Sequence, residues 1–201
     1  MAKKYTNFLR ILLAAGCGVF FACMVAQEGV CAMKHAVMII AEENFRDEEL
    51  FQTKAALEEK GITVKIASTT LNPVRGMLGA QATPELLVKD ITLTDFDAVI
   101  FVGGSGADQY WDDHLAHTIA QTAMRENRVV AAICIAPVTL ARAGVLKDIR
   151  ATVYPSEKEE LVLHGATYSG AEVEVDGNCI TASGPAAAQG FGEAIARALE
   201  K

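Results

Sequence analysis

Residues 129–140 read Val129-Val-Ala-Ala-Ile-Cys134-Ile-Ala-Pro137-Val-Thr-Leu140. The apolar run before Cys134 predicts a buried strand, and Pro137 suits the first turn of a helix. A strand that passes directly into a helix places Cys134 at a sharp corner, which is the geometry of a nucleophile elbow with cysteine in place of serine. Because a helix N-terminus favours the thiolate, we expect the pKa of Cys134 to lie below that of a free cysteine.

Apolar runs alternate with helical patterns on both sides of this corner. Further buried strands are predicted over residues 35–41, 62–68 and 97–102, and helices over residues 47–60, 114–127 and 185–199. This alternation favours an α/β fold with a mostly parallel sheet covered on both faces. Ligands gather at the carboxyl ends of such strands, so the site is expected at the strand ends after Ala41, Val102 and Ile133.

A glycine-rich turn, Val102-Gly103-Gly104-Ser105-Gly106, closes the strand over residues 97–102. Glycines there allow close approach of the backbone, and we expect the amides of Gly104 and Ile135 to face one point beside the sulfur and to stabilise an oxyanion. The turn is a poor phosphate loop because no Lys follows at the required position. No cofactor site is therefore predicted.

The loop after the first strand reads Ala41-Glu-Glu43-Asn-Phe45-Arg46-Asp-Glu-Glu49-Leu50. Acidic side chains at the start of a helix commonly compensate the helix dipole. We assign only that role to Asp47, Glu48 and Glu49.

Taken together, these motifs resemble the DJ-1/PfpI (ThiJ) superfamily, over nearly all of residues 35–201. The resemblance is carried by the order and spacing of Phe45-Arg-Asp-Glu-Glu-Leu50, Val102-Gly-Gly104, Ala132-Ile-Cys134 with Pro137, and Ser183-Gly-Pro185. It implies a flavodoxin-like three-layer α/β/α sandwich of the class I glutamine amidotransferase type, and a homodimer. It also implies that Cys134 is the reactive cysteine and that Gly104 and Ile135 provide the oxyanion amides.

Two positions depart from the family pattern. Arg46 stands where many members carry a Glu that shares a proton with the cysteine, and Ile135 stands where peptidase-like members carry His. Another nearby His of some relatives corresponds to Tyr154. The sequence thus predicts a thiol without its usual acid and base. Arg46 either holds the thiolate by its charge or pairs with Asp47 or Glu49, and Glu43 is an alternative carboxylate.

Three functions are compatible with this pattern. The first is an enzyme, a cysteine-dependent hydrolase or lyase acting on small reactive carbonyls as glyoxalases and deglycases do. The second is a non-catalytic redox-sensing or protective protein, since an accessible thiolate oxidises readily. The third, a PfpI-type cysteine peptidase, ranks last because Ile135 replaces its His.

The first 32 residues resemble a secretory signal. Lys3, Lys4 and Arg10 precede an apolar run over residues 11–26, and Val30-Cys-Ala32 offers a cleavage site. We expect residues 1–32 to direct export to the periplasm or another extracytoplasmic space, with an uncleaved membrane anchor as the alternative. Residues 33–201 then form a single domain.

Composition narrows the partners. The formal net charge of -7 disfavours nucleic acid, and membrane contact is expected only through an uncleaved N-terminal segment. His114 and His117 have a helical spacing but no third ligand, so no metal site is predicted. We expect Cys179, Tyr110 and Trp111 to serve packing, with a pocket wall or dimer contact as the alternative for the two aromatic residues.

Overall fold

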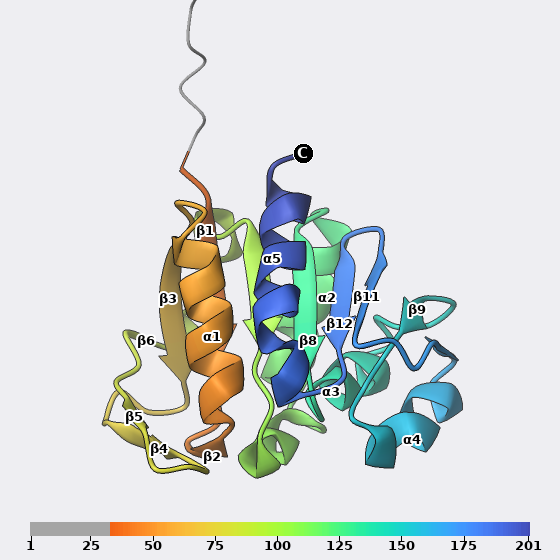
Figure 1. Ribbon diagram of the computed structural model, residues 1–201, viewed down its shortest axis with the longest axis horizontal. Coiled ribbons are helices and arrows are strands. Elements are labelled where there is room, and N and C mark those ends of the chain that lie inside the picture. The colour runs from red at the N-terminus through yellow and green to blue at the C-terminus, as the bar shows by residue number, and fades with distance from the viewer. Residues whose placement is uncertain (1–32) are drawn as a thin grey trace, which may run out of the picture. The chain divides into compact units, whose positions relative to one another are not determined.

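The computed structural model describes residues 33–201, whose centre is a sheet of seven strands in the order β11-β12-β8-β7-β1-β3-β6 (Figure 1). The six parallel strands are β1 (His35–Ile39), β3 (Thr63–Ser68), β6 (Leu86–Leu87), β7 (Ala98–Phe101), β8 (Val129–Ile133) and β12 (Cys179–Ala182). β11 (Val173–Asp176) runs antiparallel to β12 at one edge. The mostly parallel sheet predicted from the buried strands is confirmed.

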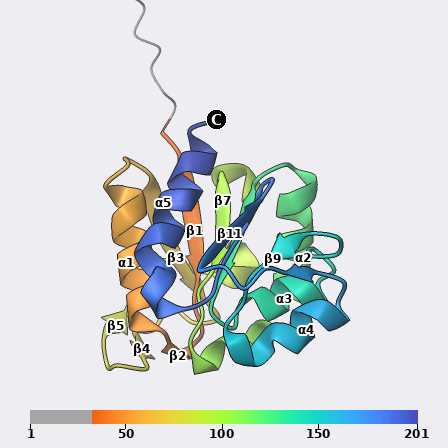
Figure 2. The same cartoon turned by 45° about the vertical axis from the view of Figure 1, so that its right-hand side comes forward.

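Helices cover both faces of the sheet, which gives three layers. Figure 2 shows α1 (Asp47–Glu58) and α5 (Ala188–Leu199) together on one side, with α2 (His114–Arg125), α3 (Pro137–Arg142) and α4 (Lys158–Leu163) on the other. α1 and α5 pack closely, and the hydroxyl of Thr53 donates a hydrogen bond of 3.1 Å to the carbonyl of Ala188. This arrangement is the α/β/α sandwich that the resemblance implied.

Alternation along β1 explains the two cores. Ala36 and Met38 are buried in the cluster beneath α1 and α5, whereas Val37 and Ile39 are buried in the cluster beneath α2 and α3. Successive side chains of a strand point to opposite faces, so a strand that is apolar throughout must be covered on both. The continuous apolar runs of the sequence therefore required helices on either side.

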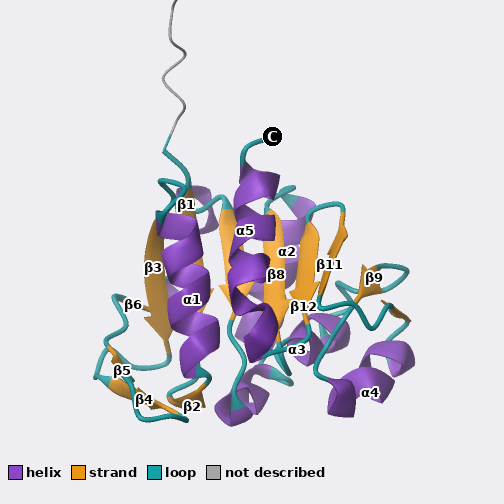
Figure 3. Cartoon of the chain, viewed as in Figure 1, coloured by secondary structure: helices purple, strands orange, loops and turns teal. Residues whose placement is uncertain are grey.

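Small elements complete the fold (Figure 3). β2 (Glu43–Phe45), β4 (Val74–Gly76) and β5 (Gln81–Ala82) form a three-stranded sheet, and β9 (Arg150–Ala151) pairs with β10 (Thr167–Tyr168). Short 3-10 helices span Val88–Asp90 (η1), Leu93–Asp95 (η2), Ser105–Tyr110 (η3), Pro155–Glu157 (η4) and Pro185–Ala187 (η5).

Asp47 joins the three-stranded sheet to α1. Its carboxylate is buried and accepts hydrogen bonds of 2.8 Å from the backbone amides of both Leu78 and Ala80. The sequence assigned Asp47 only a helix-dipole role, and that assignment is incomplete. Its further role is to hold the turn between β4 and β5 against the start of α1.

The carboxyl ends of three neighbouring strands meet at one edge of the sheet. Ile39 of β1 lies opposite Phe101 of β7, which in turn lies opposite Ala132 of β8. The chain adds β3 on one side of β1 and β7 on the other, so a topological switch point falls between β1 and β7. The segments that follow these strands are therefore brought together, as expected.

The signal-peptide prediction for residues 1–32 lies outside the described residues. Among the helices of residues 33–201, none combines the length and the apolarity that crossing a membrane requires.

Candidate active site

Cys134 occupies the corner between β8 and α3. Its φ angle is 63°, a left-handed conformation that is strained for a residue with a side chain. Hydrogen bonds hold the corner on both sides: its amide donates to the carbonyl of Ala182 at 2.9 Å, and its carbonyl accepts from the amide of Tyr154 at 2.8 Å. The residue is 9 % exposed. The corner predicted from residues 129–140 is thus present.

Two backbone amides face the sulfur. Hydrogen bonding from the amides of Gly104 and Ile135 lowers the pKa of the Cys134 thiol and so favours its thiolate. Gly104 has a φ of 105°, and a Cβ there would lie 2.3 Å from the carbonyl oxygen of Asn44. Only glycine fits this position, which explains why the turn brings its amide so close. The structure brings together the two amides that the sequence singled out.

A buried carboxyl group, that of Glu49, lies beside the sulfur. Glu49 belongs to the first turn of α1 and is fully buried, and its Oε2 accepts a hydrogen bond of 3.0 Å from the amide of Gly103. A Cβ on Gly103 would lie 2.5 Å from both the Cys134 Cβ and Glu49 Oε2. The absence of a side chain at Gly103 therefore allows the end of β7, the Cys134 thiol and the Glu49 carboxyl group to lie against one another.

This geometry corrects the sequence analysis. Glu49 was assigned only to the helix dipole, and the site was predicted to lack an acid; both statements are wrong. Glu49 shares one helical face with Thr53 and Ala56, which are also buried. Spacings of four and seven residues place side chains on one face of a helix, so this pattern marked Glu49 as inward-pointing. That was the available signal.

Arg46 forms an ion pair with Glu48, a partner that the sequence analysis did not consider. Nε and Nη2 of Arg46 lie 2.7 and 3.1 Å from the two carboxylate oxygens of Glu48. The hydrogen bond to Glu48 is the main reason why the pKa of Arg46 is raised, and Cys134 contributes least among the causes. Arg46 is therefore not the principal partner of the thiolate, because Glu48 engages its guanidinium.

Glu43 is exposed on β2 and lines two shallow surface hollows, one with Thr70 and Arg75 and the other with Ser105 and Gln109. The carboxyl group buried beside the sulfur belongs to Glu49 instead. The alternative that Glu43 supplies the carboxylate is wrong, because the Glu43 side chain on β2 lies exposed at the protein surface.

Burial controls the protonation of the pair. Desolvation raises the pKa of Glu49 to about 7, and the neighbouring thiol and the Gly103 amide offset it only in part. Desolvation, with the negative charge of Glu49, raises the pKa of Cys134 to about 12. The expected depression of the Cys134 pKa is wrong, because burial outweighs the two amides. The thiol thus needs a base, and Glu49 is the adjacent group that titrates near neutral pH.

The remaining candidates lie apart from this pair. Cys179 is buried on β12, and desolvation raises its pKa to about 12. His114 begins α2, and Nε2 of His117 lies 2.8 Å from the carbonyl oxygen of Trp111. No group of three or more His, Cys, Asp or Glu side chains within residues 33–201 is arranged to hold a metal ion.

A comparison with protein-family models matches the DJ-1/PfpI family over residues 34–198. The chain belongs to the DJ-1/PfpI family. An uncharacterised protein of Methanocaldococcus jannaschii is 44 % identical over 174 residues, covering 84 % of this chain and 85 % of its own. A deglycase of Pyrococcus abyssi is 32 % identical over 149 residues and covers 74 % of this chain and 90 % of its own.

A further family relative carries another activity in its name. A glutathione-independent glyoxalase of Caenorhabditis elegans is 26 % identical over 171 residues, covering 85 % of this chain and 91 % of its own. Among solved structures, a ThiJ/PfpI domain protein from Brachyspira murdochii superposes with a TM-score of 0.82 at 30 % identity, covering 84 % of this chain and 97 % of its own. These comparisons agree on both the DJ-1/PfpI family and the flavodoxin-like fold.

Proposed function

We propose that this DJ-1/PfpI protein converts small reactive carbonyl compounds through Cys134, in the manner of a glyoxalase or deglycase. The observation that carries the proposal is the contact of a nucleophile-elbow thiol with one buried carboxyl group and two backbone amides. Relatives named deglycase and glutathione-independent glyoxalase support this choice of substrate class.

The geometry suits addition of the sulfur to an aldehyde. Glu49 takes the thiol proton as the sulfur–carbon bond forms, and the aldehyde oxygen becomes an oxyanion between the amides of Gly104 and Ile135. Glu49 then returns the proton to that oxygen, which leaves a hemithioacetal. A base with a pKa near the working pH is the most effective one, and the raised pKa of Glu49 meets this condition.

For a 2-oxoaldehyde such as methylglyoxal, the proposed reaction is balanced without any external oxidant or reductant. Glu49 moves the carbon-bound proton of the hemithioacetal to the adjacent carbonyl carbon. The hemithioacetal hydroxyl gives up its proton to the former carbonyl oxygen and becomes the carbonyl of a lactate thioester on Cys134. Water cleaves the thioester carbon–sulfur bond, which releases lactate and restores the thiol. The sum is methylglyoxal plus water giving lactate.

Incubation with methylglyoxal, following its loss and the appearance of lactate, tests the proposal. Cys134→Ala is expected to abolish turnover, and Glu49→Gln to lower it by about 10²- to 10⁴-fold, the usual contribution of a general base. Cys179→Ala is the matched control, because Cys179 is also a buried free thiol but lies on β12. Turnover that is absent in the wild type, or equal in Cys134→Ala, refutes the proposal.

Oxidative protection by a non-catalytic thiol is the second candidate. The two amides beside Cys134 are also suited to donate hydrogen bonds to the oxygens of a sulfinate, which supports this alternative. Mild peroxide followed by intact-mass measurement distinguishes the two: added oxygen at Cys134 without methylglyoxal turnover favours protection. A peptidase ranks last, because the residue after the cysteine is Ile135, which cannot accept a proton.

We also propose a homodimer exported from the cytoplasm, with a small molecule as the substrate. Exposed apolar side chains at Phe51, Met77 and Leu78, on α1 and on the turn between β4 and β5, support the dimer. The charge and apolar pattern of residues 1–32 supports export, with an N-terminal anchor as the alternative. Light scattering and fractionation of cells are the corresponding measurements.

A further inference from the structure

The two amides beside the sulfur come from different segments of the chain. Gly104 precedes η3, which runs over Ser105–Tyr110, whereas Ile135 lies in the turn between β8 and α3. An oxyanion site works only when its donors hold a fixed position relative to each other and to the nucleophile. The two segments therefore need a connection that fixes one against the other.

Trp111, the residue directly after η3, makes such a connection. Its indole Nε1 donates a hydrogen bond of 3.2 Å to the carbonyl oxygen of Ile135. The same oxygen accepts a hydrogen bond of 3.2 Å from the amide of Val138 in α3. The indole thus links the segment that begins at Gly104 to the residue whose amide completes the pair at Cys134.

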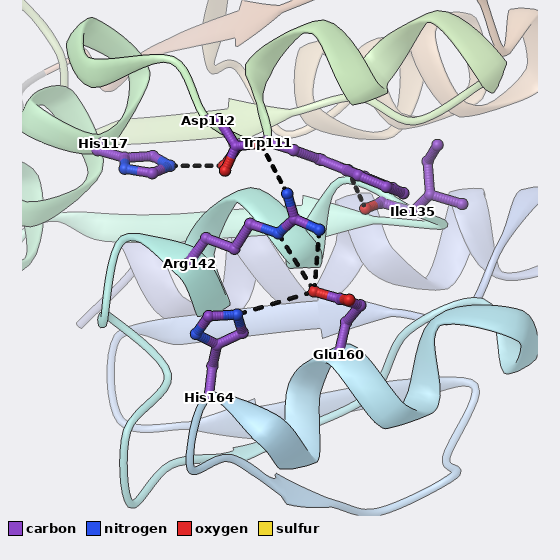
Figure 4. Close-up of polar contacts among 7 residues, drawn as sticks. All are labelled: Trp111, Asp112, His117, Ile135, Arg142, Glu160 and His164. Carbon is purple, nitrogen blue, oxygen red and sulfur yellow. Dashed lines mark hydrogen bonds and ion pairs between the residues drawn. The ribbon is translucent and has the colours of Figure 1, made fainter.

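A network of charged side chains holds the indole in place (Figure 4). The guanidinium of Arg142 lies over the Trp111 ring, 5.0 Å from its centroid, where a cation is attracted to the ring face. Arg142 also lies 2.8 Å from Asp112 and 3.1 Å from Glu160. Arg142 is the last residue of α3, the helix that starts at the reactive corner.

The backbone at Trp111 is held as well. Nε2 of His117 lies 2.8 Å from the Trp111 carbonyl oxygen. In the charged network, Nε2 of His164 lies 3.7 Å from the Glu160 carboxylate that also pairs with Arg142. Figure 4 shows the Trp111 ring above both the Ile135 carbonyl and the guanidinium of Arg142. From the sequence, the role predicted for Trp111 was packing.

We infer that Trp111 is a positioning residue, which ties Ile135 to the Gly104 segment and thereby keeps the two amides aligned on an oxyanion formed at Cys134. The inference rests on the proposed function, in that Cys134 must react with a carbonyl carbon. Trp111 acts through Ile135 and does not touch the reacting atoms. Replacing Trp111 is expected to slow reactions of Cys134 that form an oxyanion. Reactions in which the sulfur attacks and no oxyanion forms should keep their rate.

Two reactions of the same thiol separate these effects. With p-nitrophenyl acetate, the thiol proton passes to Glu49 as the sulfur bonds to the acetyl carbon, and the carbonyl oxygen becomes an oxyanion. The ester carbon–oxygen bond then breaks and p-nitrophenolate leaves. With iodoacetamide, the sulfur displaces iodide from a methylene carbon, and no oxyanion forms. The ratio of the two rate constants for Cys134 measures how well the amides are aligned, with Cys134→Ala as the background.

Trp111→Phe keeps an aromatic ring under Arg142 but removes the N–H donor. We expect it to slow acylation of Cys134 by about 2- to 10-fold, the span of one neutral hydrogen bond, and to leave alkylation by iodoacetamide unchanged. Arg142→Gln is the second variant, which serves if Trp111→Phe does not fold. It keeps the indole and should lower the same ratio less, with a red shift in the emission of Trp111, the only tryptophan in the chain.

Equal slowing of both reactions, or no change in their ratio, overturns the inference. A wild-type protein that is alkylated but never acylated at Cys134 also overturns it, because the amides would then serve no oxyanion. A wild type that does not turn over methylglyoxal, combined with selective slowing of acylation in Trp111→Phe, rejects the proposed function and supports the positioning role.

Discussion

The buried carboxyl group of Glu49 predicts an unusual dependence of stability on pH. Its pKa is raised from 4.5 to about 7, and burial is the main cause. A carboxyl group with a raised pKa in the folded state binds its proton more tightly there than in the unfolded chain. Its contribution to stability is therefore complete below pH 4.5, and is lost as the pH rises from 4.5 to about 7.

The magnitude follows from the width of that interval. At about 1.4 kcal/mol per pH unit, the free energy of unfolding should lose about 3 kcal/mol between pH 4.5 and pH 8 from this one group. Glu49→Gln has nearly the same shape and keeps an oxygen for the Gly103 amide, but it does not ionise. We expect the variant to match the wild type within about 1 kcal/mol at pH 4.5 and to exceed it by about 2–3 kcal/mol at pH 8.

Urea unfolding at five pH values between 4.5 and 8.5 measures this difference, with the wild type, Glu49→Gln and a control variant treated identically. Glu48→Gln is the matched control. Glu48 is the neighbour of Glu49, but its carboxylate is partly exposed and its pKa is lowered by the hydrogen bond from Arg46. The control should run parallel to the wild type from pH 5.5 to 8.5. Parallel curves for Glu49→Gln and the wild type would refute the reasoning, because Glu49 would then titrate alike in the folded and unfolded chain.

Three further outcomes are expected. Glu49→Gln should slow alkylation of Cys134 by iodoacetamide at pH 8, because the buried thiol loses the adjacent base that takes its proton; equal or faster alkylation contradicts this role. Gly103→Ala should destabilise the protein by more than about 2 kcal/mol in urea unfolding, since its Cβ would lie 2.5 Å from both the Cys134 Cβ and Glu49 Oε2; a neutral effect would mean that the corner can relax. Asp47→Ala should lower the free energy of unfolding by about 2–4 kcal/mol, because the amides of Leu78 and Ala80 lose their acceptor. Glu48→Ala should lower it by less than about 1 kcal/mol, and similar losses for the two variants would argue against the buried role of Asp47.

Periodicity along the chain was enough to predict the sheet and the position of the thiol. Strands that are apolar on both faces must be buried on both, and an apolar strand running into Pro137 must turn sharply at Cys134. The two amides at Gly104 and Ile135 could also be predicted, because glycines at one strand end and a helix start at the next mark where backbone N–H groups are free. These are local consequences of residue type and spacing.

Only the tertiary structure decided the chemistry around the sulfur. Among four neighbouring charged residues, Arg46 and Glu48 pair near the surface, Asp47 holds a distant turn, and Glu49 alone is buried beside Cys134. The helical spacing marks Glu49 as inward-pointing, but only the orientation of α1 on the sheet brings that side chain to the sulfur. The protonation of the thiol was misjudged for the same reason: the helix start favours a thiolate locally, but desolvation depends on everything packed around the sulfur. The link from Trp111 to Ile135 joins residues 24 positions apart and exists only once β7 and β8 lie side by side.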